Sequence, residues 1–400
     1  MKNILLYKMV IEGFDFGPFV TKLIIAWKGE TKDLKATDFT VTATRPGGDF
    51  ESEPIITGNR KITGVTADGR YVTLDLEVHP SYGVANALRA EKKEDGPGKF
   101  YMGNQWANPY THDLTYKGIE YIMECTGITM PLADSFDLTG RFTASDCVKL
   151  QYATFVPPEA EDSPRPLIIW LHGAGEGSWF GTQPANIAII GNKVVALADK
   201  KIQDLMKGAY ILAPQVPTMW MDDGTGAYTQ DGTSKYEKAL IELIERFLVD
   251  HPNVDSKRIY IGGCSNGGFM TMKAILSRPD LFAAAFPVCQ AYKPDWITEE
   301  QIKRTAQIPI WQIHARDDEI VPFAGAEETH KLLVANGAKN VYYTWYDHME
   351  DKSGLWFDDK GKPWSYGGHW SWIHVYNNDP KTTVNGKEIS LFEWLSKQAL

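Results

Sequence analysis

The residues best suited to chemistry include a serine in the segment Gly263-Cys264-Ser265-Asn266-Gly267. This segment follows a short apolar run and precedes a helical stretch. A strand, a sharp glycine-lined turn with serine at its tip and a helix are the setting of a nucleophile elbow. Gly263 and Gly267 carry no Cβ, so they permit the close backbone approach and the strained dihedrals that we expect of such a turn. Ser265 is therefore the predicted nucleophile.

A serine hydroxyl needs a base to take its proton, and that base needs an acid to fix its tautomer. We expect the acid directly after the strand that ends at Ile313. Three carboxylates compete there, and the spacing to Val321-Pro322 favours Asp318 over Asp317 and Glu319.

The base is expected after the last strand of the chain's second half. His369 follows paired glycines on a loop and precedes a helix, so it is the predicted base. His348 comes directly after the strand and stays the alternative, whereas His374 lies on the helix and is expected to pack. The chain order of serine, aspartate and histidine is the order expected of an α/β-hydrolase.

Two backbone N–H groups are expected to stabilise the oxyanion. One belongs to Asn266, because the residue after the nucleophile begins a helix whose free amides face negative charge. The other should come from the glycine-rich turn after the strand ending at Leu171, where Ala174 is favoured and Gly175 is the alternative. This turn does not match a dinucleotide-binding loop, because Ser178 stands where the third glycine would be.

Tryptophans are frequent in the loops expected at the carboxyl ends of the strands. Trp179, Trp220 and Trp370 are predicted to line a substrate pocket, with Trp356 and Trp364 in the same group of loops. Each of them taken alone is more often a packing residue, but five on one rim would suit aryl or acyl ester groups. The acidic residues of these loops, among them Asp222, are expected to form a solvated rim.

Composition argues against several classes of protein. The 400 residues carry a net charge of −10, and no basic patch with interleaved aromatics is present, so neither nucleic acid nor an anionic membrane is an expected partner. No apolar run reaches about 18 residues, and the apolar start breaks too soon for a signal peptide. We expect a cytosolic protein or the mature form of a secreted or periplasmic one.

The four cysteines predict no metal and no cofactor, because their spacing is not that of metal ligands. They also define no disulfide framework, and the state of the pairs Cys125/Cys147 and Cys264/Cys289 stays open. Cys264 and Cys289 are expected to be small buried core residues.

The two halves of the chain differ in their hydrophobic periodicity. Up to about residue 140 the period is two, turn residues separate the strands and no helix is evident, which indicates an immunoglobulin-like β-sandwich over residues 1–140. The polar, Gly/Asn-rich segment 89–111 is expected to be a long loop. Residues 141–400 alternate buried strands with amphipathic helices such as 236–248. This alternation predicts a parallel sheet covered on both faces, with ligands at the carboxyl ends of the strands.

Residues 148–398 resemble α/β-hydrolase serine esterases of the group that includes polyhydroxybutyrate-depolymerase-like, feruloyl-esterase-like and predicted peptidase proteins. The matching segments are 171–176, 213–215, 263–268, Asp318 with Val321-Pro322, and 368–372. The whole chain is similar to bacterial esterases of this group that carry an N-terminal immunoglobulin-like domain. The resemblance implies carboxylesterase activity on short acyl esters, and export. The chain departs from the group at residues 347–366, where many relatives run almost directly from strand to histidine.

The leading hypothesis is an esterase that forms an acyl-enzyme on a small-molecule or polymer-linked ester. A serine peptidase of the same fold stays open, as does a polymer- or carbohydrate-binding protein without activity. The intact set of Ser265, Asp318 and His369 argues against the latter, and no extended peptide site is evident. The N-terminal domain is expected to bind polymer, to mediate oligomers or to form a wall of the site.

Overall fold

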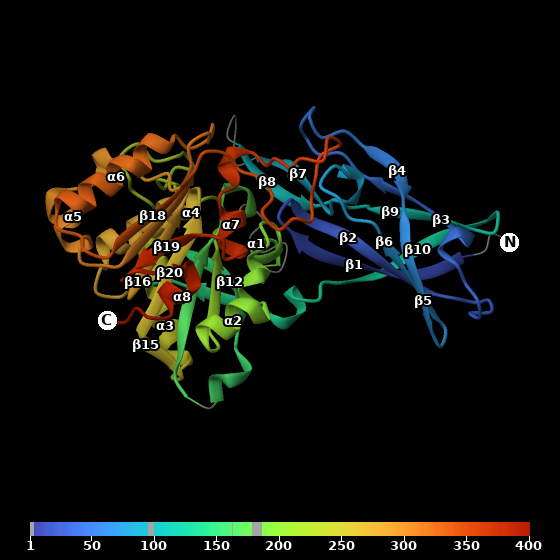
Figure 1. Cartoon of the computed structure of the whole chain (residues 1–400), viewed down its shortest axis with the longest axis horizontal. Helices are drawn as coiled ribbons and strands as arrows, with labels where there is room; N and C mark the ends of the chain where they lie inside the picture. The colour runs from blue at the N-terminus through green and yellow to red at the C-terminus, as the bar shows by residue number, and fades with distance from the viewer. Residues whose placement is uncertain (1–3, 95–99, 162, 178–185) are drawn as a thin grey trace. The chain divides into compact units, whose positions relative to one another are not determined.

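The computed structural model describes residues 4–94, 100–161, 163–177 and 186–400 (Figure 1). The chain divides into two compact units. The first comprises Met1–Lys92, Asn104–Ser135 and Ile190–Lys193, and the second comprises Lys93–Gly103, Phe136–Ile189 and Val194–Leu400.

The first unit is built mainly of strands, as its period-two pattern predicts. Its eight-stranded sheet has the order β4-β3-β9-β10-β1-β2-β6-β5. The strands are β1 (Ile4–Phe14), β2 (Gly17–Ala26), β3 (Phe39–Arg45), β4 (Ile56–Arg60), β5 (Ile62–Asp68), β6 (Tyr71–Leu76), β9 (Thr111–Tyr116) and β10 (Ile119–Thr129). Strand β10 joins two ladders, since its start pairs with β9 and the rest of it pairs with β1. Tyr7 of β1 contacts His112 of β9 with 3.0 Å between Oη and Nδ1, and both side chains are buried between the ladders.

The expectation of a long loop over residues 89–111 is wrong. Two strands, β7 (Leu88–Glu94) and β8 (Phe100–Trp106), pair there in a separate two-stranded sheet, and β9 begins at Thr111. A two-stranded ribbon does not need a buried apolar face, so a polar sequence without period-two alternation can form one.

The second unit contains an eight-stranded sheet of order β11-β12-β14-β13-β15-β16-β17-β18. These strands are β11 (Asp137–Thr143), β12 (Lys149–Phe155), β13 (Arg165–Leu171), β14 (Tyr210–Gln215), β15 (Val254–Cys264), β16 (Ala284–Val288), β17 (Ile310–Ala315) and β18 (Val341–Tyr346). From β14 to β18 neighbouring strands are parallel, and β12 runs antiparallel to both β11 and β14. The predicted parallel sheet is therefore present, with an antiparallel pair at one edge.

Helices follow most of the parallel strands. They are α1 (Asn186–Ile190), α2 (Lys200–Met206), α3 (Glu237–Asp250), α4 (Asn266–Ser277), α5 (Glu299–Thr305), α6 (Phe323–Ala335), α7 (Trp372–Tyr376) and α8 (Leu391–Leu395), and a hairpin of β19 (Lys381–Val384) and β20 (Lys387–Ser390) precedes α8. No helix of the described ranges is both long and apolar enough to cross a membrane.

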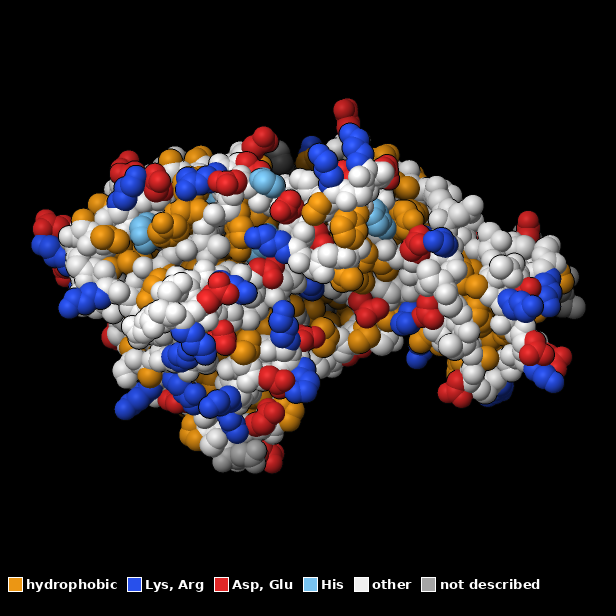
Figure 2. All heavy atoms as spheres, in the orientation of Figure 1, with side chains coloured by type: hydrophobic (Ala, Val, Ile, Leu, Met, Phe, Trp, Pro, Cys, Tyr) orange, Lys and Arg blue, Asp and Glu red, His pale blue; other side chains and the backbone are white. Residues whose placement is uncertain are grey.

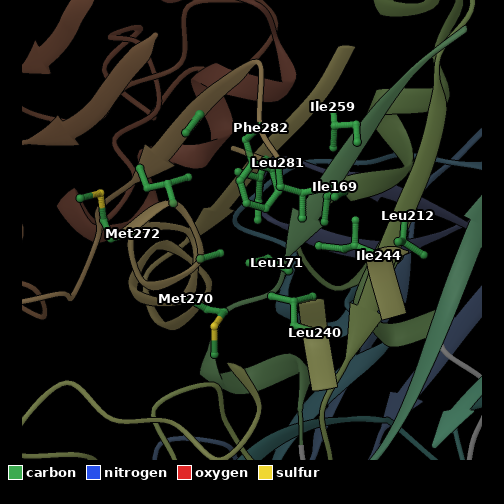
Figure 3. Packing of buried hydrophobic residues seen from close by; sticks show 14 of the residues in the cluster. Ile169, Leu171, Leu212, Leu240, Ile244, Ile259, Met270, Met272, Leu281 and Phe282 are labelled. Carbon is green, nitrogen blue, oxygen red and sulfur yellow. The ribbon is translucent and has the colours of Figure 1, made fainter. Parts of the chain in front are cut away.

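The core of the second unit explains why the carboxyl ends of its strands are fixed in place. Helix α3 buries one stripe, with Leu240 and Ile244 one turn apart, against Ile169 of β13 and Leu212 of β14 (Figure 3). Helix α4 adds Met270 to the same cluster. Strands buried on both faces keep little freedom, so the loops at their carboxyl ends start from fixed positions.

Candidate active site

Ser265 occupies the turn between β15 and α4. Its backbone has φ of 56° and ψ of −112°, a conformation that is costly for a residue other than glycine. Its N–H donates to the carbonyl of Val288 at 3.0 Å, and its own carbonyl accepts from Phe269 at 2.9 Å. The strained dihedrals therefore lie in the serine itself. They do not lie in Gly263 and Gly267, where the sequence analysis placed them.

The glycines of the elbow serve close packing instead. A Cβ on Gly267 would lie 1.9 Å from the carbonyl oxygen of Leu171, and a Cβ on Gly263 would lie 2.6 Å from the same oxygen. Gly268 is as tight, with 2.6 Å from its Cβ position to the oxygen of Val288. The first turn of α4 thus rests directly on the ends of β13 and β16, which holds Ser265 beside both strands.

Asp318 and His369 meet although 51 residues separate them in the chain. Nδ1 of His369 lies 2.8 Å from Oδ2 and 3.0 Å from Oδ1 of Asp318. Asp318 follows β17, and His369 lies in a single 3₁₀ turn (Gly368–Trp370) before α7. The aspartate side chain is fully buried, whereas that of His369 is 15% exposed. This is the geometry of an acid that fixes a base by its Nδ1–H and leaves Nε2 for catalysis.

Hydrogen bonds keep the carboxylate of Asp318 ionised. Burial by itself would raise the pKa of this carboxyl, but donors from His314 and His369 and the N–H of Val321 hold the pKa well below its ordinary range. Oδ1 accepts from the N–H groups of Ile320 and Val321, both at 2.9 Å. A charged acceptor is therefore in place opposite His369.

The alternative acids and bases considered from the sequence do not take part in this pair. Asp317 and Glu319 are exposed, in contrast to the buried Asp318 between them. His348 has a side chain that is 62% exposed and lies 3.5 Å from Glu350. His374 is fully buried and pairs with an aspartate outside the site, as a packed helix residue would.

Ser265 has no hydrogen bond to Asp318 or His369 in the part of the chain that the structure describes. Among the described residues, no hydrogen bond joins Ser265 Oγ to Nε2 of His369, a contact that often tightens only when substrate binds. Cys289 follows Val288, the acceptor of the Ser265 N–H, and its Sγ lies within 4.8 Å of a carboxylate oxygen of Asp318 and a ring nitrogen of His369. Burial, with the charge of Asp318, raises the pKa of the Cys289 thiol. The thiol is therefore protonated near neutral pH, as expected of a small buried core residue.

The expected oxyanion donors lie at the ends of two adjacent strands. Ala174 begins a 3₁₀ turn (Ala174–Glu176) after β13, and Asn266 begins α4 after β15. Within the described residues, neither backbone N–H donates to a protein acceptor. Both are therefore free to bind a developing negative charge.

His172 supports this turn and was not singled out from the sequence. Its Nδ1 lies 2.6 Å from the carbonyl oxygen of Gly173, and its Nε2 accepts the N–H of Val216 at 3.2 Å. Because Nε2 accepts, the proton of the ring is on Nδ1. Burial lowers the pKa of His172 to about 4. The neutral imidazole therefore connects the residues that follow β13 and β14 by hydrogen bonds.

The tryptophans predicted to line a substrate pocket differ in their exposure. Trp179 lies outside the described residues. Trp220 is fully buried, with its ring 5.3 Å from that of His172, so it belongs to the core and offers no surface to a ligand. Trp370 is 38% exposed and is adjacent to His369 in the chain, and its role in a substrate pocket stays a prediction. Trp356 and Trp364 are partly exposed.

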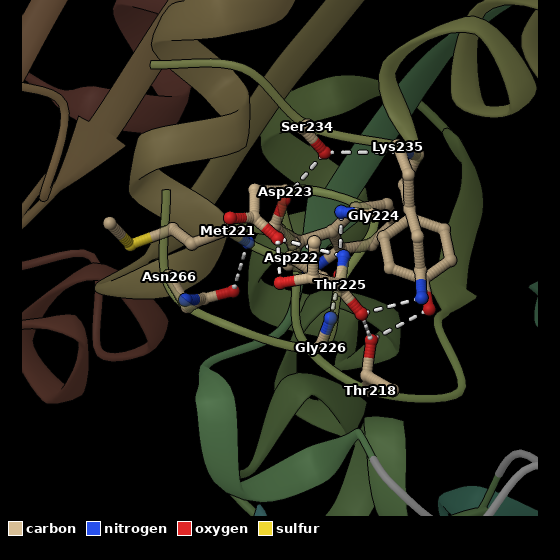
Figure 4. Close-up of polar contacts among 12 residues, drawn as sticks. Thr218, Met221, Asp222, Asp223, Gly224, Thr225, Gly226, Ser234, Lys235 and Asn266 are labelled. Carbon is tan, nitrogen blue, oxygen red and sulfur yellow. Dashed lines mark hydrogen bonds and ion pairs between the residues drawn. The ribbon is translucent and has the colours of Figure 1, made fainter. Parts of the chain in front are cut away.

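The loop between β14 and α3 is fixed by a buried carboxylate (Figure 4). Asp222 accepts hydrogen bonds from Thr218 at 2.6 Å and from the N–H of Gly224 at 2.9 Å, and it pairs with Lys235 at 2.5 Å. The expectation that Asp222 belongs to a solvated rim is wrong, because these donors replace water. Asn266 reaches the same loop through its Oδ1, which accepts a backbone N–H at 3.2 Å.

Comparison with known proteins places the two units in known families. A family described as Phospholipase/Carboxylesterase matches residues 153–355, about half of the chain, a range that includes Ala174, Ser265, Asn266 and Asp318 and ends before His369. The chain belongs to the phospholipase/carboxylesterase family. Residues 6–118 match the esterase Ig-like N-terminal domain. The α/β-hydrolase fold, the immunoglobulin-like domain and the esterase-type hydrolase family are thereby confirmed.

Two individual relatives support this membership. A solved structure of a thermostable esterase has a TM-score of 0.74 and 26% identity, and the match covers 98% of this chain and 99% of that one. Acyl-protein thioesterase 1 of Eremothecium gossypii is 28% identical over 120 residues. That match covers 30% of this chain and half of the thioesterase's own length.

Proposed function

We propose that this member of the phospholipase/carboxylesterase family hydrolyses short-chain acyl or aryl esters through an acyl-enzyme on Ser265. The observation that carries the proposal is the 2.8 Å contact between His369 and the buried Asp318, in a chain whose Ser265 occupies a strained elbow. The thermostable esterase, similar over nearly the whole chain, supports an ester as substrate.

The first step would acylate the serine. Oγ of Ser265 attacks the carbonyl carbon of the ester while Nε2 of His369 takes the hydroxyl proton. Asp318 accepts the Nδ1–H and stabilises the imidazolium. The carbonyl oxygen becomes negative and accepts from the N–H groups of Ala174 and Asn266. The bond from carbon to the alcohol oxygen then breaks, and the alcohol leaves with the proton from Nε2.

The second step would release the acid. Water attacks the acyl carbon while Nε2 of His369 takes one of its protons, and the same two N–H groups bind the oxyanion. Collapse returns the proton to Oγ of Ser265 and releases the carboxylic acid. Atoms and charges balance without a metal or a redox partner.

A substrate panel tests the proposal. We expect p-nitrophenyl acetate and butyrate and an aryl ester to be turned over, and Ser265→Ala to lower kcat by about 10⁴–10⁶-fold. An S-acyl thioester, an acetylated sugar and a peptide p-nitroanilide complete the panel. Turnover of the anilide with kcat/KM above that of the esters would favour a peptidase. No turnover of any member, with the protein folded, would contradict the proposal.

A further inference from the structure

A second histidine approaches the carboxylate of Asp318 from inside the sheet. His314 lies near the carboxyl end of β17, four residues before Asp318, and its side chain is fully buried. Its Nε2 lies 3.0 Å from Oδ2 of Asp318, the same oxygen that accepts from His369. Nothing in the family match or in the acyl-enzyme scheme above requires this residue.

We propose that His314 is a positioning residue that holds Asp318 ionised and aimed at His369. The inference rests on the proposed function, since it assigns His314 a role in the reaction described above. The inference concerns Asp318, whereas the proposed function depends first on Ser265, so the inference and the proposed function can be tested separately.

The hydrogen-bonding pattern fixes the tautomer of His314. Nε2 also lies 3.1 Å from the carbonyl oxygen of Val321. Both neighbours of Nε2 are acceptors, so Nε2 must carry the proton and is shared between them. Nδ1 is buried and has no hydrogen-bond partner in the part of the chain that the structure describes, which agrees with a bare nitrogen there.

With His314, both oxygens of the Asp318 carboxylate accept two hydrogen bonds or more. Oδ1 accepts two backbone N–H groups, and Oδ2 accepts from the two imidazoles. Rotation of the carboxylate would break several of these bonds at once. Without His314, Oδ2 would depend on His369 alone in a dry environment, where a carboxylate with fewer donors is less stable as an ion.

Strand pairing and ring contacts hold the side chain of His314 in a fixed position. Its residue pairs in register with Trp345 of β18, and its ring meets that of Phe323 edge to face at 5.7 Å. Phe323 also meets the ring of Trp345 edge to face at 5.1 Å, and the guanidinium of Arg316 lies 4.8 Å from its ring centroid. A donor fixed by the sheet therefore sets the position of the acid, and through it that of the base on its separate loop.

Substitutions that keep or remove the donor test this role. His314→Gln places an amide N–H near the position of Nε2, whereas His314→Leu removes the donor. We expect His314→Leu to lower kcat on p-nitrophenyl acetate about 10–100-fold with KM within about threefold, and His314→Gln to restore kcat to within about fivefold of wild type. Rates are normalised to the number of sites titrated by a fluorophosphonate, so that misfolded protein is not counted.

His374→Leu is the matched control. His374 is equally buried, and its Nδ1 lies 2.9 Å from Asp379, but it has no hydrogen bond to Ser265, Asp318 or His369. This variant should lose stability and keep kcat per titrated site. If His314→Leu does not fold, His314→Asn replaces it, because its shorter amide cannot reach Asp318. His314→Asn should have a lower kcat on p-nitrophenyl acetate than His314→Gln.

Three results would overturn the inference. These are wild-type kcat per site in His314→Leu, no difference between His314→Gln and His314→Asn, and an equal loss of kcat in His374→Leu. Each of them leaves the acyl-enzyme proposal standing as long as wild-type protein is labelled at Ser265. Absence of that labelling would instead remove the proposed function itself.

Discussion

Residues of one type have different roles in this site because their surroundings differ. Asp317 and Glu319 face solvent, while Asp318 between them is buried and receives only donors. Among the histidines, His369 is partly exposed and paired with an acid, whereas His172 is buried between two backbone groups. Charge state and access, rather than residue type, decide which of them can take part in proton transfer.

His172 should make the second unit sensitive to acid. Its pKa falls from 6.5 to about 4 on folding, so the unfolded chain binds more protons between these values and stability is lost as pH falls through that window. We expect about 2 kcal/mol of this loss between pH 7 and pH 5. Denaturant melts at several pH values, followed by tryptophan fluorescence, measure it. His172→Gln should be less stable at pH 7 and should have a smaller pH dependence. An equal pH dependence in the variant would contradict the account.

The sequence was sufficient to propose the residues whose roles depend on chain order and local motif. Ser265 has a strand–turn–helix signature, and Asp318 and His369 follow later strands. It was not sufficient for His314 and His172, because a lone histidine at the end of a buried strand has the same pattern as a core residue. Which atoms such a ring contacts depends on neighbouring strands, and a single sequence does not contain those contacts.

The turn that carries His369 contains a glycine that packs against the backbone and side chain of Asp317. The loop of His369 lies against the turn of Asp318 at Gly368, where a Cβ would lie 2.4 Å from Oδ1 of Asp317 and 2.5 Å from the carbonyl oxygen of the same residue. Gly367, the other glycine of the pair, has nothing within 4 Å of its Cβ position. The two neighbours therefore make a matched pair for mutation.

We expect Gly368→Ala to lower kcat on p-nitrophenyl acetate at least tenfold, because the added methyl group must push the His369 loop away from Asp318. Gly367→Ala should keep kcat within about twofold. Steady-state kinetics and a thermal melt of each variant measure the effect and separate it from unfolding. Equal activity of the two variants would show that the approach at Gly368 does not position the base.

The elements themselves were predictable where burial shapes their sequence. The strands and helices of the second unit carry buried runs or stripes, and their order identifies the fold. The β7–β8 ribbon and the buried role of Asp222 were not predictable, because a polar segment gives no pattern that distinguishes a paired ribbon or an internal network from a solvated loop.

At the scale of the whole molecule, the chain combines a carboxylesterase-type unit with an immunoglobulin-like one, as its match to the thermostable esterase reflects. Acidic and basic side chains are interspersed over the face seen in Figure 2. This face therefore offers no continuous positive field to attract a polyanion. Short-chain acyl or aryl esters, small or attached to a polymer, remain the substrates we propose.

We expect the chemistry to reside in the second unit. A fragment of residues 136–400 keeps all of β11, the edge strand that begins at Asp137. Its kcat should stay within about tenfold of the full chain, with the larger changes in solubility, oligomeric state or KM. Size-exclusion chromatography and kinetics compare the two proteins. A folded fragment that a fluorophosphonate does not acylate would place part of the site in the removed residues 1–135.

The most direct measurement is the rate and position of fluorophosphonate labelling at neutral pH, followed by intact mass and peptide mapping. The account predicts one label per chain, on Ser265, and none in Ser265→Ala. His369→Ala should be labelled at least about 10³-fold more slowly, while His348→Ala stays within about tenfold of wild type. Labelling on another residue would contradict the account, as would a reactive His369→Ala beside an unreactive His348→Ala.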